Sequence, residues 1–456
     1  MASPTQRLTL ALLLSVLNLG AAPLSLNEAI SLLKEQNLEI KAASLEAKNA
    51  QNDVSLSQGY SYGALDFTQN VIRSNDAGNV FGFKLSSREA TFGDFGAQEF
   101  MASTANPSGP DYVTPPKNLN YPGYQNFFQS KLTYAVPLYT GGKLGSYEKI
   151  AQEMEKIKQL DTTKVTAEKI YETRKSYYDM ALLNHSIEKL QVIQKNIATL
   201  QSTTKQMLQE GYAKKVDLLE VEAKKANVDR MILEMQANKK LLYHYLSFLL
   251  NQKVTDIAAP SDDRASAAIT EADVIANNSD LKKASHGLKI RSSMLDVATA
   301  PYLPTVGAFA EASSADNTFL GKFSDHAAYT IGARLSWNLY NGGIDAHTLE
   351  KARIDHLKTS TEVELAKKGI ALQYDKIQTE IESLDYQVAS LEKELNLSTQ
   401  IYKSYEGRYR ENLTSMSDLI IKQSQQIEKI INLQMVKNQR NERIFALEKL
   451  SYGANQ

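Results

Sequence analysis

The sequence contains residue types that can do chemistry, but none at a spacing that builds a catalytic or metal site. No two of its six histidines are three or four residues apart, so no pair can hold a metal from one face of a helix. Asp94-Phe95-Gly96 has the spelling of a kinase metal motif, yet no glycine-rich phosphate loop or His-Arg-Asp sequence accompanies it. No Ser-His-Asp triad or carboxylate pair can be argued either. We therefore predict no catalytic residue, no metal and no cofactor.

A second candidate, Gly141-Gly142-Lys143, lacks the spacing of a phosphate loop and predicts a tight turn instead. This turn occurs twice. Leu138-Tyr139-Thr140-Gly141-Gly142 returns as Leu339-Tyr340-Asn341-Gly342-Gly343, 201 residues later, and Asp217 and Asp418 keep the same offset. The pattern indicates an internal duplication, in which each copy has a strand that passes through Gly-Gly into a long helix.

The composition narrows the class of protein. The 456 residues include 51 basic and 52 acidic side chains, a balance that gives no electrostatic reason to expect nucleic acid as a partner. Cysteine is absent, so disulfides and cysteine-held metals are excluded. Residues 1–22 are typical of a secretory signal, with Arg7, the apolar run 8–19 and the small residues 20–22. Because this run is too short to span a bilayer, we expect an exported protein.

Two proline-free spans, 138–259 and 305–456, predict long helices. In the second copy, apolar residues alternate at spacings of four and three and tyrosines continue the seam: Ile377, Ile381, Leu384, Val388, Leu391, Leu395, Tyr402, Tyr405 and Tyr409. The first copy has a matching seam at Met180, Leu183, Ile187, Leu190, Ile197 and Leu208, interrupted by Gln194, Gln201 and Thr204. Such long helices need partner helices alongside, so each copy is predicted to form a helical hairpin.

The hairpins are predicted over residues 143–250, with a tip at 208–217, and over 344–451, with a tip at 409–418. Gly211 and Asn412 occupy matching places in the tips, and both residue types readily take a left-handed helix end. Asp217 and Asp418 follow the tips directly. Two interpretations of these carboxylates stay open: helix N-caps, or rings of charge that favour cations in a pore built from several copies.

Strand patterns with a period of two precede each Gly-Gly pair. The four predicted strands cover residues 60–72, 126–139, 303–314 and 327–340. Between its two strands the first copy carries 42 more residues than the second, within 73–122, and their Pro, Gly, Asn and Ser content predicts a surface loop. The chain then divides into a signal (1–22), a first repeat (23–250), a linker (251–280) and a second repeat (281–456).

Four strands of this length have exposed edges and cannot close a barrel, whereas three copies would supply twelve strands. Tyrosine is abundant, with 23 Tyr against one Trp, and it gathers near the strands together with that Trp: Tyr60, Tyr62, Tyr121, Tyr124, Tyr134, Tyr139, Tyr329, Trp337 and Tyr340. Two interpretations stay open for this set, an aromatic girdle at membrane interfaces or ordinary β-propensity and packing.

The duplicated Leu-Tyr-x-Gly-Gly, the matched tips and the preceding strands together resemble the TolC-like outer-membrane efflux proteins, over residues 24–456. Asn37-Leu38-Glu39-Ile40 is similar to that family's Asn-Pro-x-Leu opening, and Ala300-Pro301-Tyr302-Leu303-Pro304 precedes the third strand. The resemblance implies an α+β membrane protein. Its homotrimer would form a 12-stranded β-barrel in outer-membrane lipid, continued by a 12-helix α-barrel through the periplasm.

The resemblance also implies a function without chemistry. The trimer would be the passive exit duct of a tripartite efflux pump or a type I secretion system, exporting small molecules or proteins. It would work with a periplasmic adaptor protein and an inner-membrane pump of the RND or ABC type. By the same resemblance the adaptor docks at the tips, on Gly211, Tyr212, Asn412 and Leu413.

In this family the pore is shut at the tips by links between neighbouring hairpins. Aligned by the tip motif, Tyr409 matches the gate tyrosine, Asp217 its carboxylate partner and Asp418 a ring aspartate that faces the lumen. Thr414 and Ile421 depart from the family, because they replace the gate arginine and a second ring aspartate.

Arg408 and Arg410 flank Tyr409 and could substitute for the missing gate arginine. An alternative from another class is a soluble periplasmic coiled-coil scaffold without a pore. Such a scaffold needs no amphipathic strands, and an exported enzyme would need a catalytic cluster that the sequence does not contain.

Overall fold

The computed structural model describes residues 23–105, 109, 112–260, 269–411 and 413–452. The predicted signal at 1–22 and Asn412 lie outside the described residues. The chain separates into two compact units. The helical unit holds the described residues of 23–47, 158–284 and 363–452, and the strand unit holds those of 48–157 and 285–362.

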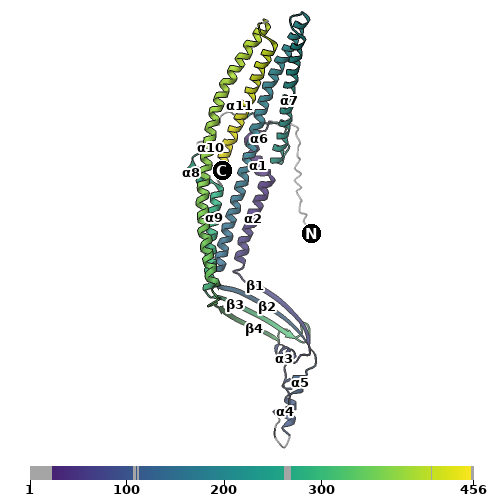
Figure 1. Cartoon of the computed structure of the whole chain (residues 1–456). Helices are drawn as coiled ribbons and strands as arrows, with labels where there is room; N and C mark the ends of the chain where they lie inside the picture. Colours follow the sequence, from purple (N-terminus) through teal and green to yellow (C-terminus); the bar gives the residue numbers. More distant parts are fainter. Residues whose placement is uncertain (1–22, 106–108, 110–111, 261–268, 412, 453–456) are drawn as a thin grey trace, which may run out of the picture. The chain divides into compact units, whose positions relative to one another are not determined.

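The helical unit contains four whole helices: α1 (Leu26–Gln36), α7 (Lys215–Leu249), α8 (Glu271–Asn277) and α11 (Met416–Leu450). It also contains the greater part of the two longest helices, α6 (Lys143–Gln209) and α10 (Ile344–Arg410), and the first residues of α2 (Leu38–Gly59) and α9 (Ser279–Thr299). Within this unit α6 pairs with α7 and α10 pairs with α11 as helical hairpins (Figure 1). None of the helices in the described part of the chain has the length and hydropathy of a membrane span.

The predicted seams form the core of this unit. One cluster near the tips takes residues from all four long helices, including Leu190 and Val221, both fully buried, and Tyr402 and Leu419. A second cluster joins α1, α6 and the end of α7, and a third joins α8, α10 and α11. Burying one Leu or Ile side chain contributes about 1.5–3 kcal/mol, so the apolar seams supply most of the attraction between these helices.

The end of each return helix, α7 or α11, is joined to the start of a helix earlier in its own repeat, α2 or α9, by one buried asparagine. The Asn37 side chain donates to the Leu249 carbonyl at 2.8 Å, and its oxygen accepts the N–H groups of Glu39 and Ile40 at 3.0 Å. Asn278 repeats this arrangement with the carbonyl of Leu450 and the first N–H groups of α9. A single amide thus satisfies the last carbonyl of one helix and the first donors of another.

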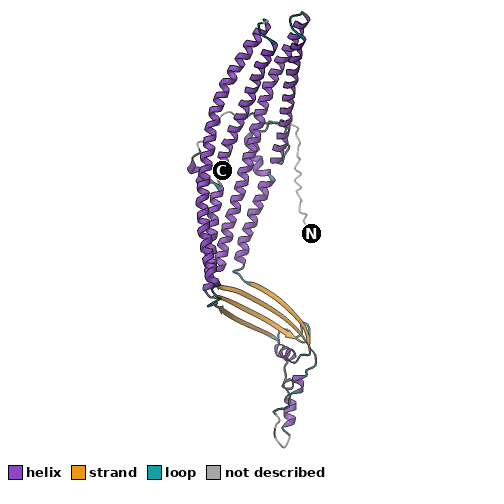
Figure 2. Cartoon of the chain, viewed as in Figure 1, coloured by secondary structure: helices purple, strands orange, loops and turns teal. Residues whose placement is uncertain are grey.

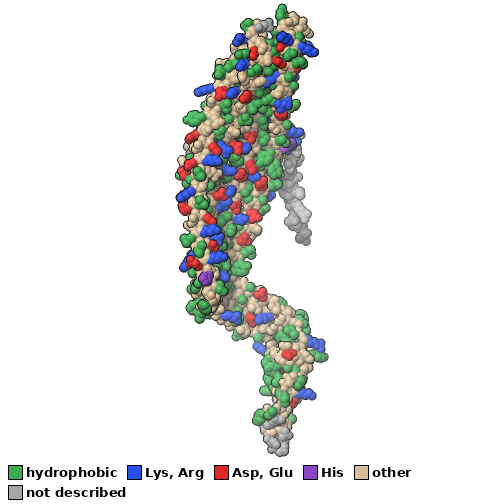
Figure 3. Space-filling model, viewed as in Figure 1, with side chains coloured by type: hydrophobic (Ala, Val, Ile, Leu, Met, Phe, Trp, Pro, Cys, Tyr) green, Lys and Arg blue, Asp and Glu red, His purple; other side chains and the backbone are tan. Residues whose placement is uncertain are grey.

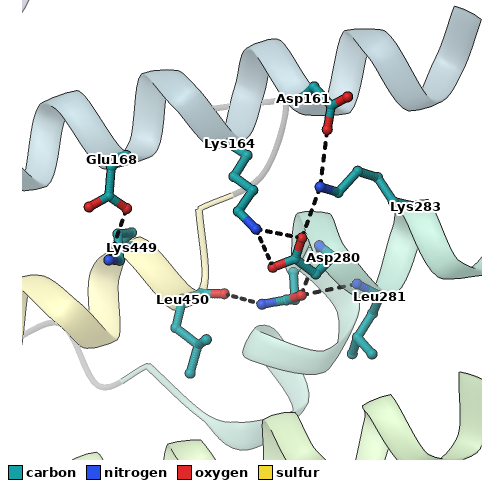
Figure 4. A network of polar contacts seen from close by, with 9 residues as sticks. Asp161, Lys164, Glu168, Asp280, Leu281, Lys283, Lys449 and Leu450 are labelled. Atoms are coloured by element: carbon teal, nitrogen blue, oxygen red, sulfur yellow. Dashed lines mark hydrogen bonds and ion pairs between the residues drawn. The ribbon is translucent and has the colours of Figure 1, made fainter. Parts of the chain in front are cut away.

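Lysines fasten the beginning of α9 to α6 beside this second asparagine (Figure 4). The Lys164 ammonium lies 2.9 Å from both carboxylate oxygens of Asp280, and Lys283 bridges Asp280 and Asp161 at 2.9 and 3.1 Å. Burial raises the pKa of Asp280, but the hydrogen bonds from Lys164 and Lys283 outweigh it and hold that pKa below its usual value. The network therefore stays charged at neutral pH.

The strand unit is built on one antiparallel sheet with the order β1-β2-β3-β4 (Figure 2). Its strands are β1 (Ala64–Ser74), β2 (Gln125–Thr140), β3 (Thr305–Asp316) and β4 (Ala327–Ser336). A short 3₁₀ turn, η2 (Ala300–Tyr302), leads into β3. The connection between β1 and β2 contains α3 (Ala77–Ser86), η1 (Phe92–Phe95), α4 (Ala97–Ser103) and α5 (Lys117–Asn120).

The predicted boundaries differ from the structure in four places. The strand predicted at 327–340 ends at Ser336, because β3 begins only after Pro304 and offers no partner beyond Thr305. The strand predicted from residue 60 begins at Ala64, since α2 continues to Gly59. The predicted linker at 251–280 contains α8 and the start of α9, and the predicted surface loop contains helices.

Candidate functional site: a two-faced sheet and the helical tips

The sheet has two chemically different faces. Side chains alternate along a strand, so residues in register on neighbouring strands share a face. We call one face the apolar face, and its central rows are Leu65–Tyr134–Ala310–Ile331 and Phe67–Leu132–Ala312–Tyr329. Phe67, Tyr329 and Ile331 are 68, 82 and 75% exposed. Large apolar side chains this exposed mark a surface that an apolar environment has to cover.

The opposite face, the polar face, carries the rows Asp66–Thr133–Glu311–Thr330 and Thr68–Lys131–Ser313–Ala328. On it the Lys131 ammonium lies 2.8 Å from a Glu311 carboxylate oxygen. The strands place two charged residues on the apolar face, Arg73 and Asp316, and both lie at the end of the sheet away from the Gly-Gly turns. The middle of the apolar face is therefore uncharged. In Figure 3, Lys, Arg, Asp and Glu are dense over the long helices and sparse over the strands.

The sheet is open at both sides. Among the described residues β1 pairs only with β2 and β4 only with β3, so these edge strands of 11 and 10 residues each present a row of unpaired backbone groups. Long edges of this kind template pairing with another chain. β2 contains Pro137, which lies at a β-bulge and so removes no regular ladder hydrogen bond from the middle of the sheet.

The Gly-Gly pairs lie between the strands and the long helices. Gly141 and Gly142 have φ angles of 65° and 81°, and Gly342 and Gly343 have 73° and 82°. These left-handed conformations favour glycine over any residue with a Cβ atom. Gly141 has a second constraint, because an added Cβ would lie 2.6 Å from the Ala300 carbonyl oxygen.

At the first tip, Gly211 ends α6 with a φ of 81°, and the exposed Tyr212 follows it. The Asp217 carboxylate accepts the backbone N–H of Lys214 at 2.8 Å, at the start of α7. Asp217 thus has the contact of a helix-capping residue within one subunit.

The second tip repeats this arrangement with different residues. Asp418 and Ser415 bond reciprocally at the start of α11: the Asp418 N–H donates to Ser415 Oγ at 3.1 Å, and that hydroxyl donates to the carboxylate at 2.6 Å. The hydroxyl of Ser415 holds the pKa of Asp418 below its usual value. Leu413, in the same tip, is 61% exposed.

The gate tyrosine predicted from the sequence is buried between the two hairpins. Tyr409 is 5% exposed, and its hydroxyl lies 3.5 Å from Thr204 Oγ1 on α6. Burial raises the pKa of Tyr409, and the negative charge of Asp217 raises it further. The structure therefore gives the Tyr409 hydroxyl to Thr204, and Asp217 acts on it through its charge alone. Of the flanking arginines, Arg410 pairs with Glu406 at 2.8 Å, and Arg408 lies over the ring of Tyr405.

The sequence identified polar interruptions in the first seam, but not their partners. Gln194 donates to Asp229 at 2.6 Å and Gln201 to Glu222 at 3.4 Å, both across the α6–α7 hairpin. The sequence did offer a signal for these partners, since α7 carries a polar residue opposite each of the two glutamines. Among the described residues, no group of three or more His, Asp or Glu could hold a metal ion.

Comparisons with known proteins agree with this geometry. Residues 272–451 match the family model described as "Outer membrane efflux protein". No curated protein matches the sequence. Among solved structures, CusC matches with a TM-score of 0.78 and 13% identity, covering 94% of this chain and 92% of CusC.

Two further solved structures match over a similar share of the chain. The outer membrane protein VceC from Vibrio cholerae gives a TM-score of 0.75 at 15% identity, covering 94% of this chain and 96% of VceC. The Campylobacter jejuni CmeC outer membrane channel gives 0.76 at 12% identity, with 94 and 85% covered. At these identities the structural matches establish the fold, over nearly the whole chain. Together with the match of residues 272–451 to the efflux family model, this fold confirms the predicted resemblance to the outer-membrane efflux proteins.

Proposed function

We propose that three copies of this chain form a passive exit duct across the outer membrane, serving a tripartite efflux pump or a type I secretion system. The observation that carries this proposal is the sheet, which has one apolar face, one polar face and two free edges. Lipid would cover the apolar face, and the polar face would line a water-filled pore. Pairing β1 of each copy with β4 of the next would remove every free edge and give 12 strands.

The tips are the proposed periplasmic end of the duct and its gate. Tyr409, Asp217 and Asp418 would close the pore there, with Arg408 and Arg410 close by, because the tips bring residues of both hairpins together. Exposed side chains at the tips, Tyr212 at 70% and Leu413 at 61%, offer a docking surface for the periplasmic adaptor. Export would then be driven by an inner-membrane pump of the RND or ABC type.

The chain's lack of cysteine makes the assembly directly testable. We would introduce Thr68→Cys in β1 and Thr330→Cys or Ala328→Cys in β4, all on the polar face. Oxidation of membranes from the double variants should give covalently linked trimers for one of the two pairs. Thr68→Cys alone is the matched control and should give none. A protein that extracts without detergent and runs as a monomer would instead support the periplasmic scaffold.

The gate has its own test, which is single-channel conductance in planar bilayers. Tyr409→Phe combined with Asp217→Ala should raise the conductance, because the pair removes a buried hydroxyl between the hairpins and the carboxylate whose charge acts on it. Thr204→Val removes only the hydroxyl partner and should give a smaller rise. Unchanged conductance in the double variant would contradict the gate assignment. Purifying the protein from its native membrane with the adaptor and pump still bound, and identifying both, would distinguish a tripartite efflux pump from a type I secretion system.

A further inference from the structure

We propose that α3, in the long connection between β1 and β2, folds over the polar face of the sheet and narrows the outer mouth of the pore. The inference rests on the proposed function, because it takes the polar face as the pore wall. It concerns the end of the sheet away from the Gly-Gly turns, where the strands lead into their connections.

One aromatic contact fixes the side on which α3 lies. The rings of Phe83 on α3 and Phe127 on β2 stack with centroids 4.3 Å apart and planes 11° apart. Phe127 pairs in register with Ile72. It lies two and four positions before Gln129 and Lys131 on β2, so all three side chains share the polar face. It is only 6% exposed. An aromatic residue at the end of a polar face is thus covered by the helix and not by solvent.

Two further buried apolar residues also place α3 on the polar face. Val80, one turn before Phe83 on α3, is 3% exposed, and so is Ala315, which is in register with Gln129 on the polar face. α3 contacts both β2 and β3. The helix therefore lies across the polar face of two neighbouring strands and does not merely continue one of them.

The β3–β4 connection, at the same end of the sheet, packs against the apolar face instead. Phe319, between β3 and β4, packs edge-on against Phe128, with ring centroids 5.9 Å apart. Phe128 belongs to the apolar face, since it follows Phe127 directly and pairs with Asp316. Asp316 accepts the N–H groups of Thr318 and Lys322 at 2.8 Å and so shapes this connection. Only the β1–β2 connection lies toward the proposed pore.

α3 is also braced by its own connection. Asp76 caps its first turn by accepting the Asn79 N–H at 3.0 Å. Lys84 pairs with Asp94 of η1, and Phe81 meets Phe95 edge-on at 5.1 Å. The hydrogen bond from Lys84 lowers the pKa of Asp94 to about 2, so the ion pair is present at neutral pH. A helix held in this way in each subunit can obstruct the outer mouth of the shared pore.

The test measures access from outside the cell to a cysteine placed in the pore wall. Thr68→Cys lies on the polar face, two rows inward from the Phe127 row. A small charged maleimide should label it on intact cells, and a maleimide carrying a polyethylene glycol chain should label it slowly. Adding Phe83→Ala should raise the rate at which the large reagent labels Thr68→Cys by about fivefold to tenfold. This is the increase in the population of the open mouth expected when one aromatic contact is lost. Phe83→Leu, which keeps the apolar volume, should give an intermediate rate.

Matched controls separate the possible outcomes. Phe92→Ala removes a ring that is 87% exposed in the same connection and should leave both rates unchanged. Met101→Cys, on the exposed helix α4, should react with both reagents in every background. If the large reagent labels Thr68→Cys as fast with Phe83 as without it, the constriction does not exist. If Met101→Cys reacts but Thr68→Cys reacts with neither reagent in any background, the polar face is not a pore wall and the proposed function fails.

Discussion

The two hairpins have the same lengths but are fastened by different chemistry. α6 and α10 each have 67 residues, and α7 and α11 each have 35. The first hairpin is linked across by hydrogen bonds, from Gln194 to Asp229, from Gln201 to Glu222 and from Tyr245 to Glu172, and the ion pairs among the described residues include none between α6 and α7. The second is linked across by four ion pairs: Glu394–Lys429, Glu392–Lys437, Asp385–Arg440 and Glu380–Arg443.

This difference separates what the duplicated architecture requires from what it tolerates. Both copies keep an apolar seam, which sets the pairing of the helices. The ion pairs have diverged, whereas glutamine hydrogen bonds cross both hairpins, as from Gln426 to Thr399 in the second. Since partly exposed ion pairs are weak and screened by salt, they can vary without loss of the fold.

The largest expected effect tests the shared seam. Leu190→Ala in α6 and Leu419→Ala in α11 each remove a fully buried side chain, and each should lower the free energy of unfolding by about 2–5 kcal/mol. The measurement is denaturant unfolding of the purified protein in detergent. Leu233→Ala, at a site that is 65% exposed, is the control and should change little. A loss in only one hairpin would show that the two seams are not equivalent.

The sequence predicted the seam and the turns because both depend on local spacing. Ile377, Ile381 and Tyr409 are buried as the heptad pattern indicates, and Gly141 and Gly342 take left-handed conformations where the strand-to-helix turns were expected. The Gly-Gly pairs also marked correctly where α6 and α10 begin.

Contacts between residues far apart in the sequence could not be predicted. The cover of Phe127 by Phe83 depends on a helix inside a segment rich in loop-forming residues, and its side of the sheet depends on register. In the same way, Tyr409 was aligned with a carboxylate partner, while the packing of α6 against α10 brings Thr204 to its hydroxyl. Spacing identifies the residues that matter, but tertiary packing selects their partners.

A smaller effect concerns one carboxylate on α6. Burial raises the pKa of Asp179 from its usual 3.8 to about 6, Lys175 opposes this rise, and Glu442 of α11 adds to it. The folded protein therefore favours the protonated form, so the penalty for ionising Asp179 grows as the pH rises from 3.8 to about 6 and is complete above that. Asp179→Asn should stabilise the protein at pH 8 by about 1–2 kcal/mol and progressively less as the pH falls from 6 to 4. Melting temperatures across this range would check it, and an equal gain at pH 4 and pH 8 would contradict the assignment.

The smallest effect tests the difference between the hairpins. Arg440→Gln removes one ion pair from the second hairpin and should lower the stability by less than about 1 kcal/mol at low salt, with the loss disappearing at high salt. Gln194→Ala in the first hairpin removes a bond to Asp229 and should give a loss that salt changes less. The comparison is made by thermal unfolding at two salt concentrations. Equal salt dependence in both variants would remove the proposed distinction.

Phe127 and Phe128 are neighbours in β2, yet each receives a different connection on a different face of the sheet. Strand side chains have a period of two, so the insertion or deletion of one residue ahead of this pair would exchange their faces. Such a slip would move the anchor of α3 into the lipid and bring the anchor of the β3–β4 connection into the channel. The pairing register of β2 with its neighbouring strands would then decide whether the proposed outlet is wide or narrow, and the sequence of either connection would not. Relatives of this protein could therefore gain or lose an obstructed outlet by a single codon.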